Sequence, residues 1–218
     1  MTVVSILAGA TGLVGGHLAT ELAATGQKTI ALVRKPAPAL PPAVKQTVCD
    51  FARLDVLEAV PADAVFCALG TTIAKAGSRE AFRQVDYDAI LALGRYGRRN
   101  GARQFLLVSS VGASVASFNF YLRVKAEAER DLAALGYLAF HIFRPGVLVG
   151  ARAESRLGER LGIAFAQTLG PLLVGPLAQY RAIEAATVAR AMAKVSQIPA
   201  TGVSLYHYRE MVGLAGRH

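Results

Sequence analysis

The sequence predicts an α/β fold in which a doubly wound parallel sheet is flanked by helices and carries a small C-terminal cap. Short apolar runs alternate with helical segments along most of the chain, which is the pattern of parallel strands joined by right-handed crossovers. Hydrophobic residues make up 53% of the 218 residues, as expected for a sheet buried on both faces. A glycine-rich turn also follows the first apolar run directly and opens the first helical segment.

Strands and helices are expected where these runs and segments alternate. Most of the six strand-like runs are rich in Val, Ile, Leu and Phe without polar alternation, as in interior parallel strands. The strands are expected at Val3–Ala8, Thr29–Val33, Val44–Val48, Ala64–Ala68, Gln104–Ser109 and Leu138–Phe143. The helices are expected at Leu13–Ala24, Leu54–Ala59, Arg79–Asn100 and Asn119–Leu135. Three glycines fall just past a helix, where a left-handed residue is favoured: Gly26, Gly101 and Gly136.

One domain is expected over residues 1–218, because domains of this length are common. After Gly150 the alternation weakens, and residues 151–218 are expected to contribute a small substrate cap. Its elements are expected as helices around Ser155–Leu169 and Ile183–Ser196, a strand at Val203–His207 and a short final helix. The uncharged stretch Leu161–Ala178 is interrupted by glycines and prolines, so a helix and an apolar loop are expected there and not a membrane span.

Charge and cysteine content exclude several classes of protein. Lys and Arg number 24 against 15 Asp and Glu, a formal charge of +9. No dense basic tail accompanies this excess, so neither nucleic acid nor a membrane surface is expected as a partner. Cys49 and Cys67 are too few for a disulfide framework and indicate a reducing compartment. No Cys and His spacing suggests a metal, and the first residues lack a secretory pattern, so a cytoplasmic protein is expected.

The glycine-rich turn has the sequence Gly9-Ala10-Thr11-Gly12-Leu13-Val14-Gly15 and connects a strand to a helix. In this position Gly9 permits a tight turn, Gly12 lets the backbone approach a pyrophosphate, and Gly15 lets the helix pack closely on the strand. The pyrophosphate meets the unpaired N–H groups of the first helical turn. The turn therefore predicts a dinucleotide-binding Rossmann fold, and its GxxGxxG spacing favours the short-chain dehydrogenase/reductase superfamily.

A tyrosine and a lysine four residues apart are the candidate catalytic pair. Tyr121 and Lys125 lie in a predicted helix, so their side chains share one face. A free tyrosine has a pKa of about 10, and a nearby ammonium favours its phenolate form. Ser109 and Ser110 follow the fifth predicted strand, at the edge where parallel sheets bind ligands. We expect Ser110 to orient the substrate oxygen, with Ser109 as the second choice on the cofactor side.

Together these segments resemble the atypical short-chain dehydrogenase/reductases, and within them the Tat-interacting-protein branch. The likeness runs from Val3 to Gly150, with further similarity at Tyr180–Ala193. The matching segments are Gly9–Gly15, Leu107–Ala113, Tyr121–Lys125 and Phe143–Leu148. The resemblance implies a nicotinamide dinucleotide as cofactor and hydride transfer as the chemistry.

The resemblance also implies the positions of several residues around the cofactor. The backbone of Pro145-Gly146-Val147-Leu148 is implied to face the nicotinamide, and Asp50 to contact the adenine amino group. Ala68-Leu69-Gly70 should line the other side of the cofactor. One departure concerns the proton relay, because Asp86 stands where many members carry an asparagine that helps a water chain reach the lysine.

Two functions follow from these residues. The second predicted strand ends in Leu32-Val33-Arg34-Lys35 without an acidic residue. Cations there suit a ribose 2′-phosphate, so NADP(H) is favoured over NAD(H). The first function is an NADP(H)-dependent oxidoreductase that acts on a small carbonyl or alcohol, with Tyr121 as acid or base and Lys125 as ribose ligand. The alternative is a non-catalytic NADP(H)-binding protein with a regulatory or assembly role.

Overall fold

The computed structural model describes residues 3–150 and 175–216 and is built around a parallel sheet of seven strands. The strands are β1 (Val4–Ala8), β2 (Lys28–Val33), β3 (Val44–Val48), β4 (Ala64–Cys67), β5 (Gln104–Val108), β6 (Ala139–Phe143) and β9 (Gly202–Tyr206). Their order is β3-β2-β1-β4-β5-β6-β9, and every neighbouring pair runs parallel. The order reverses between β1 and β4, which is the topological switch point where such sheets bind ligands.

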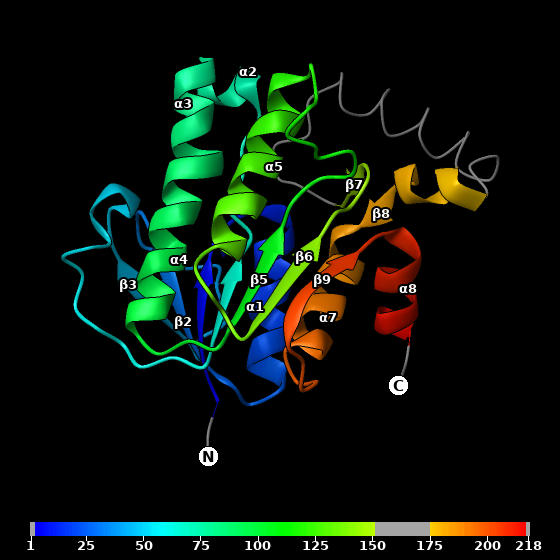
Figure 1. Cartoon of the computed structure of the whole chain (residues 1–218). Coiled ribbons are helices and arrows are strands. Elements are labelled where there is room, and N and C mark those ends of the chain that lie inside the picture. Colours follow the sequence, from blue (N-terminus) through cyan, green and yellow to red (C-terminus); the bar gives the residue numbers. More distant parts are fainter. Residues whose placement is uncertain (1–2, 151–174, 217–218) are drawn as a thin grey trace.

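Helices cover both faces of this sheet (Figure 1). One face carries α1 (Leu13–Ala24) and α7 (Ala185–Val195), and the other carries α4 (Ala89–Arg99) and α5 (Phe120–Ala133). The shorter helical elements are η1 (Phe51–Arg53), α2 (Ile73–Ala76), α3 (Arg79–Arg83), η2 (Gln84–Asp88), η4 (Gly175–Tyr180) and α8 (Tyr208–Gly216). A second, two-stranded sheet joins β7 (Leu148–Val149) to β8 (Ile183–Glu184). The doubly wound Rossmann-type architecture is thus confirmed.

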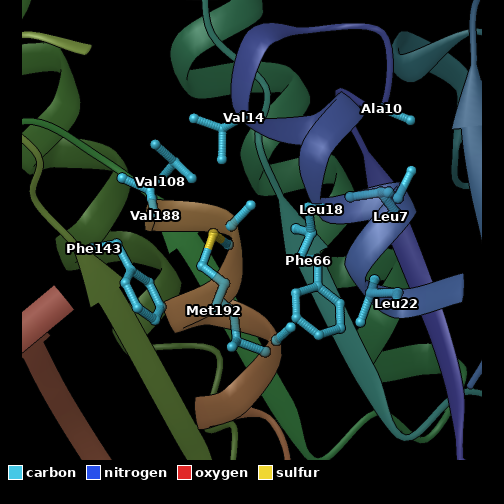
Figure 2. Packing of buried hydrophobic residues seen from close by; sticks show 14 of the residues in the cluster. Leu7, Ala10, Val14, Leu18, Leu22, Phe66, Val108, Phe143, Val188 and Met192 are labelled. Carbon is cyan, nitrogen blue, oxygen red and sulfur yellow. The ribbon is translucent and has the colours of Figure 1, made fainter. Parts of the chain in front are cut away.

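The two faces of the sheet have separate apolar cores, because successive side chains of a strand point to opposite faces. Figure 2 shows the core beneath α1 and α7, where Leu18 of α1 and Met192 of α7 pack with Phe66 of β4. Phe105 and Leu107 of β5 face the opposite core, beneath α4 and α5. All six predicted strands are present, and each end lies within one residue of the prediction.

The predicted helix at Arg79–Asn100 is present as α3, η2 and α4 in succession. The backbone stays right-handed helical through both junctions, with φ of −56° at Gln84 and −62° at Asp88. The middle element η2 is a π-helix, whose backbone hydrogen bonds span one residue more than those of an α-helix and which is frequent at functional sites. Asp86, in this π turn, is completely buried. Sequence periodicity gave no sign of the π turn.

The prediction of a helix at Leu54–Ala59 is wrong. A 3₁₀ helix at Phe51–Arg53 is followed by turns and irregular chain. In a helix these backbone carbonyls would accept hydrogen bonds from backbone N–H groups, but here they accept hydrogen bonds from side chains of α4. The Arg99 guanidinium donates to the carbonyls of Leu54, Asp55 and Leu57, and the Tyr96 hydroxyl donates to the Glu58 carbonyl at 2.8 Å.

The helix, the strand and the short final helix predicted after Ile183 are present as α7, β9 and α8, and the first two of these pack on or join the main sheet. The strand predicted at Val203–His207 is β9, which pairs with β6 and extends the central sheet. The helix predicted at Ile183–Ser196 is α7, preceded by the short strand β8, and it packs against α1 on the main sheet. The helix expected around Ser155–Leu169 and most of the stretch Leu161–Ala178 lie outside the described residues. Within the described ranges, no helix combines the length and apolar character needed to cross a bilayer.

Candidate functional site

The glycine turn between β1 and α1 depends on two glycines for its shape. Gly9 has φ of +82°, in the left-handed region that favours glycine, and a Cβ on it would collide with the Ala68 backbone. A Cβ on Gly15 would collide with the Gly9 carbonyl. Gly12 is less constrained, since its N–H donates to Gly9 O at 2.9 Å and its Cβ would lie 3.1 Å from that oxygen. Gly9 thus lies against Ala68, so two segments predicted to bind the cofactor, Gly9–Gly15 and Ala68–Gly70, meet at the switch point between β1 and β4.

The N-terminus of α1 faces the place where a pyrophosphate is expected. Gly12 is the N-cap and supplies no side-chain acceptor, and the first turn of α1 contains no acidic residue. The first turn of α1 therefore offers no negative charge to its own positive dipole end, which leaves that end available to a bound anion. Thr11 is exposed, and Leu13 lies beside the end of β7, since a Cβ on Gly150 would be 3.0 Å from Leu13 Cδ1.

The predicted adenosine residues lie at the ends of β2 and β3. Arg34 and Lys35 are exposed directly after β2. Asp50 follows β3, and its carboxylate accepts the Ala52 N–H at 2.9 Å, which caps η1. A local capping role explains this contact without a ligand. These three residues are separated from β5 by β1 and β4, so the residues predicted to bind adenosine and those predicted to be catalytic lie at different strands of the same sheet.

Backbone hydrogen bonds join the loop after β4 to the end of β1, and the loop after β5 to β6 and the loop that follows it. Ala68 N–H donates to Ala8 O at 2.9 Å, which keeps Ala68 and Leu69 beside the glycine turn. Ser109 N–H donates to Phe143 O at 2.7 Å, and Val111 N–H donates to Pro145 O at 2.9 Å. The segment from Pro145 to Leu148, predicted to face the nicotinamide, is thereby fixed next to the serine pair. Its Gly146 approaches Tyr180 so closely that a Cβ would lie 3.0 Å from the Tyr180 carbonyl.

Helix α5 presents the candidate catalytic pair to this edge. Asn119 is its N-cap and accepts the Tyr121 N–H at 2.9 Å, a favoured cap that starts the helix one residue before Tyr121. The Tyr121 ring packs on the buried Phe82 ring with centroids 5.5 Å apart. Lys125 Nζ lies 6.0 Å from the Tyr121 ring centroid. The predicted helical spacing of the pair is confirmed, and both residues occupy one face.

Lys125 forms a buried ion pair with Asp86. Lys125 Nζ lies 2.8 Å from Asp86 Oδ1, and the other carboxylate oxygen accepts the Thr71 N–H at 2.9 Å. Burial by itself lowers the pKa of Lys125, but the Asp86 carboxylate and then Tyr121 outweigh it, so this pKa is raised above its usual value. Gly70 lies next to the pair, since its Cβ would be 3.5 Å from both charged atoms. Asp86 thus contacts the lysine directly, where the resemblance implied a water chain.

The two serines differ in their surroundings. Ser110 Oγ donates to the Val111 carbonyl at 3.3 Å. Ser109 is buried, and among the described residues its Oγ has no hydrogen-bond partner. Ser109 continues the alternation of β5 on the side of Leu107, which faces α5. An unpartnered buried hydroxyl is costly, so Ser109 has the stronger geometric case for a ligand contact.

An ion pair between Glu129 of α5 and Arg144, called the Arg144–Glu129 brace below, was not predicted as part of the site. Arg144, directly after β6, donates from Nε and Nη2 to the two Glu129 oxygens at 3.0 and 2.5 Å. Glu129 lies one turn after Lys125 on the same face of α5. The brace therefore fixes the Pro145 loop relative to the Tyr121 helix. The signal in the sequence was the repeated spacing of Tyr121, Lys125 and Glu129.

Solved structures with the same fold bind nicotinamide dinucleotides. The chain is similar to human epimerase family protein SDR39U1 with NADPH, at a TM-score of 0.63 and 17% identity, over 94% of this chain and 74% of that one. It is also similar to UDP-glucose 4-epimerase from Bifidobacterium longum with NAD⁺ and UDP, at a TM-score of 0.71 and 16% identity, over 93% and 77%. At these identities the likeness shows the fold.

Curated relatives are more similar in sequence. Protein HTATIP2 of Rattus norvegicus is 40% identical over 73% of this chain and 64% of its own length. The mitochondrial protein fmp52 of Emericella nidulans is 37% identical over 75% of each chain. A third relative, mitochondrial FMP52 of Candida albicans, is 42% identical, and this chain spans 48% of its length. The resemblance to the Tat-interacting-protein branch is thus confirmed.

These names also correct the predicted location. The expectation of a cytoplasmic protein is contradicted, because the fungal relatives are named mitochondrial. That expectation depended on a missing secretory pattern, which does not separate one non-secretory compartment from another. For the family itself, a sequence profile described as NAD(P)H-binding matches residues 9–199. The profile covers the glycine turn, the Asp86–Lys125 pair and the Pro145 loop, so this chain belongs to the NAD(P)H-binding family.

Proposed function

We propose that this chain is an NADP(H)-dependent oxidoreductase that transfers hydride to or from a carbonyl or alcohol carbon. The observation that carries the proposal is the placement of Tyr121 and buried, charged Lys125 on one face of α5, beside the loops that follow β4 and β5. A lysine is costly to bury, and this one lies one turn from the candidate acid or base.

The residues at the sheet edge fit a nicotinamide dinucleotide. The fit depends on Gly12, which adds no side chain to the uncapped N-terminus of α1, and on Gly70, where a Cβ would lie 3.5 Å from Lys125 Nζ. Bound, the cofactor supplies or accepts the hydride. We assign the 2′-phosphate to Arg34 and Lys35, because both are exposed cations next to β2. Solved neighbours hold NAD as well as NADPH, so this preference is the first part to test.

Proton transfer, ribose binding and substrate positioning are assigned to side chains of this protein. Tyr121 exchanges a proton with the substrate oxygen, and Lys125 donates to a ribose hydroxyl while it orients the tyrosine. A serine hydroxyl holds the substrate oxygen, and Ser109 joins Ser110 as a candidate because its Oγ has no partner within the described ranges. The Arg144–Glu129 brace keeps the loop at Pro145 at a fixed position relative to α5.

A specific observation favours the second candidate, an NADP(H)-binding protein without catalysis. Asp86 pairs with Lys125, so the ammonium is less available to favour a phenolate at Tyr121. A lysine held in this way can still bind a ribose hydroxyl. The two candidates therefore share the cofactor and differ in turnover.

The experiment is a screen of aldehydes and ketones, monitored by the loss of NADPH absorbance. We expect turnover with at least one carbonyl and a weaker affinity for NADPH in Lys125→Met, because the lysine serves both ribose and tyrosine. Lys194→Met, on α7, is the control and should match the native chain. NADPH binding without turnover across the panel would favour the non-catalytic candidate, and absence of NADPH binding would contradict both.

A further inference from the structure

The two edges of the central sheet differ in how well they are protected from pairing with another chain. β3 and β9 are the edge strands (Figure 1). β3 carries the exposed Lys45, and its Gln46 side chain bonds both backbone groups of Ala37 in the loop before it. Charged side chains and covering loops are ways in which proteins keep an edge strand unpaired. β9 has no charged residue and no proline, and its five residues pair with β6 in unbroken register.

The free hydrogen-bonding groups of β9 belong to Val203 and Leu205. Gly202 N–H donates to Leu138 O at 2.8 Å, and Tyr206 O accepts the N–H of the residue after β6 at 2.9 Å. Alternate residues of a parallel strand bond to the same neighbouring strand. The N–H and C=O groups of Val203 and Leu205 therefore point away from β6. In the part of the chain that the structure describes, no backbone group bonds to them.

The same two residues also expose apolar side chains. Val203 is 57% exposed and Leu205 is 47% exposed. Their register partners on β6, Phe140 and Ile142, are buried in the core beneath α4 and α5. The helix after β9, α8, packs with Met211 in the core on the opposite face, so it leaves these side chains uncovered. Free backbone groups and exposed apolar side chains thus coincide on one edge strand.

We propose that two copies of this chain pair through β9, antiparallel and about a two-fold axis at Ser204, so that their central sheets form one continuous sheet. In this register Val203 of one copy lies opposite Leu205 of the other, and each such pair exchanges two backbone hydrogen bonds. All the free N–H and C=O groups of these residues are then paired. A two-fold contact of this kind closes at the dimer.

The chemistry of the edge favours a second copy over a different partner. The chain has a formal charge of +9, but β9 itself has none, so β9 offers no charge by which to select an acidic segment, and two copies bring no like charges into the strand pair. The two-fold register places each exposed apolar side chain opposite another, and Tyr206 opposite Gly202. The edge is therefore complementary to itself.

The first test is the mass in solution of the native chain and of Leu205→Lys, measured by analytical ultracentrifugation. We expect a dimer of the native chain, and dimerisation at least about tenfold weaker in Leu205→Lys, because an ammonium group enters an apolar contact. The position is exposed, so circular dichroism should remain native. Val56→Lys is the matched control, because Val56 is an apolar residue outside the strands that is 65% exposed. It should dimerise like the native chain.

A disulfide tests the register. Cys49→Ser is included in every protein of this test, so that an added cysteine is the one thiol besides the buried Cys67. In the proposed register Ser204 lies opposite its own copy as a non-hydrogen-bonded pair, with Cα atoms roughly 4.5 Å apart, which a disulfide can span. Ser204→Cys should therefore form a cross-linked dimer on oxidation. Thr201→Cys is the control and should not, because its two copies lie roughly 20 Å apart.

Three results would overturn the proposal. A monomeric native chain would exclude the dimer and leave the edge to a strand of a different protein. A dimer that Leu205→Lys does not weaken would place the contact elsewhere on the molecule. Equal cross-linking of Ser204→Cys and Thr201→Cys, or none of Ser204→Cys, would contradict the two-fold register. These measurements need neither cofactor nor substrate, so they are independent of the oxidoreductase function.

Discussion

At the scale of single residues, the three glycines of the turn have different roles although one motif predicts them together. Gly9 and Gly15 are required by the fold itself, since a Cβ on either would collide with backbone atoms. At Gly12 a Cβ would lie 3.1 Å from the Gly9 carbonyl oxygen, a tight contact that a small shift relieves, and under the proposed function a bound pyrophosphate adds a second constraint. The sequence motif predicts the positions of the three glycines, and only the packing separates structural from ligand-binding roles.

Two substitutions separate these roles. Gly15→Ala should destabilise the protein by at least about 1–3 kcal/mol, the usual cost of overpacking. Gly12→Val should remain folded and lose NADPH affinity, because its side chain occupies the space of the pyrophosphate. Thermal unfolding and NADPH fluorescence titration measure the two effects. Native NADPH affinity in Gly12→Val would show that the turn is structural only.

The cofactor preference is also a property of single residues. Arg34→Ala should weaken NADPH binding by roughly 1.5–3 kcal/mol, the scale of a charge-assisted hydrogen bond, and leave NADH binding unchanged. Arg53→Ala, an exposed arginine in η1, is the control. Calorimetric titration with both cofactors checks this. Equal affinities of the native chain for NADPH and NADH would contradict the assignment to Arg34 and Lys35.

At the scale of elements, apolar runs predicted the six strands well because buried parallel strands are continuously hydrophobic. The failure at Leu54–Ala59 has a tertiary cause: the chain there is held by Arg99, a residue 40 or more positions away in sequence. The π turn was also unpredictable, since its extra residue is stabilised by the contacts of Asp86 with Thr71 and Lys125. Local sequence patterns contain no information about either the Arg99 hydrogen bonds or the Asp86 contacts, because both join segments that are far apart in the sequence.

The Arg99 contacts can be tested in the same segment. Arg99→Met should lower the free energy of unfolding by about 0.5–1.5 kcal/mol, because three backbone carbonyls at the surface lose a donor that solvent replaces only in part. Arg95→Met changes an exposed arginine on the same helix and should have little effect. Urea unfolding of both variants measures the difference. Equal stabilities would show that solvent replaces the Arg99 contacts without cost.

At the scale of the whole molecule, stability should depend on one buried histidine. His141 in β6 is 0% exposed, and burial lowers its pKa from 6.5 to about 4. The unfolded chain binds a proton at this residue below pH 6.5, and the folded chain does so only near pH 4. Stability is therefore lost as the pH falls between these values, by up to about 3 kcal/mol.

The pH dependence of unfolding in variants checks this expectation. His141→Leu should flatten the loss of stability between pH 6.5 and pH 4, while His17→Leu, at an exposed position on α1, should keep the native slope. Carboxylates titrate in the same range in all three proteins, so the comparison isolates His141. Identical slopes in the native chain and His141→Leu would contradict it.

The direct test of the central claim is a comparison of Tyr121→Phe with the native chain, once the screen has found a carbonyl substrate. Tyr121→Phe removes one hydroxyl, so NADPH affinity and thermal stability should remain native. General acid–base catalysis typically contributes 10²–10⁴-fold, so kcat should fall by roughly that factor. Tyr208→Phe, the same change on α8, should leave kcat unaltered. Native kcat in Tyr121→Phe would contradict the proton-transfer role of Tyr121 and favour the non-catalytic, cofactor-binding function.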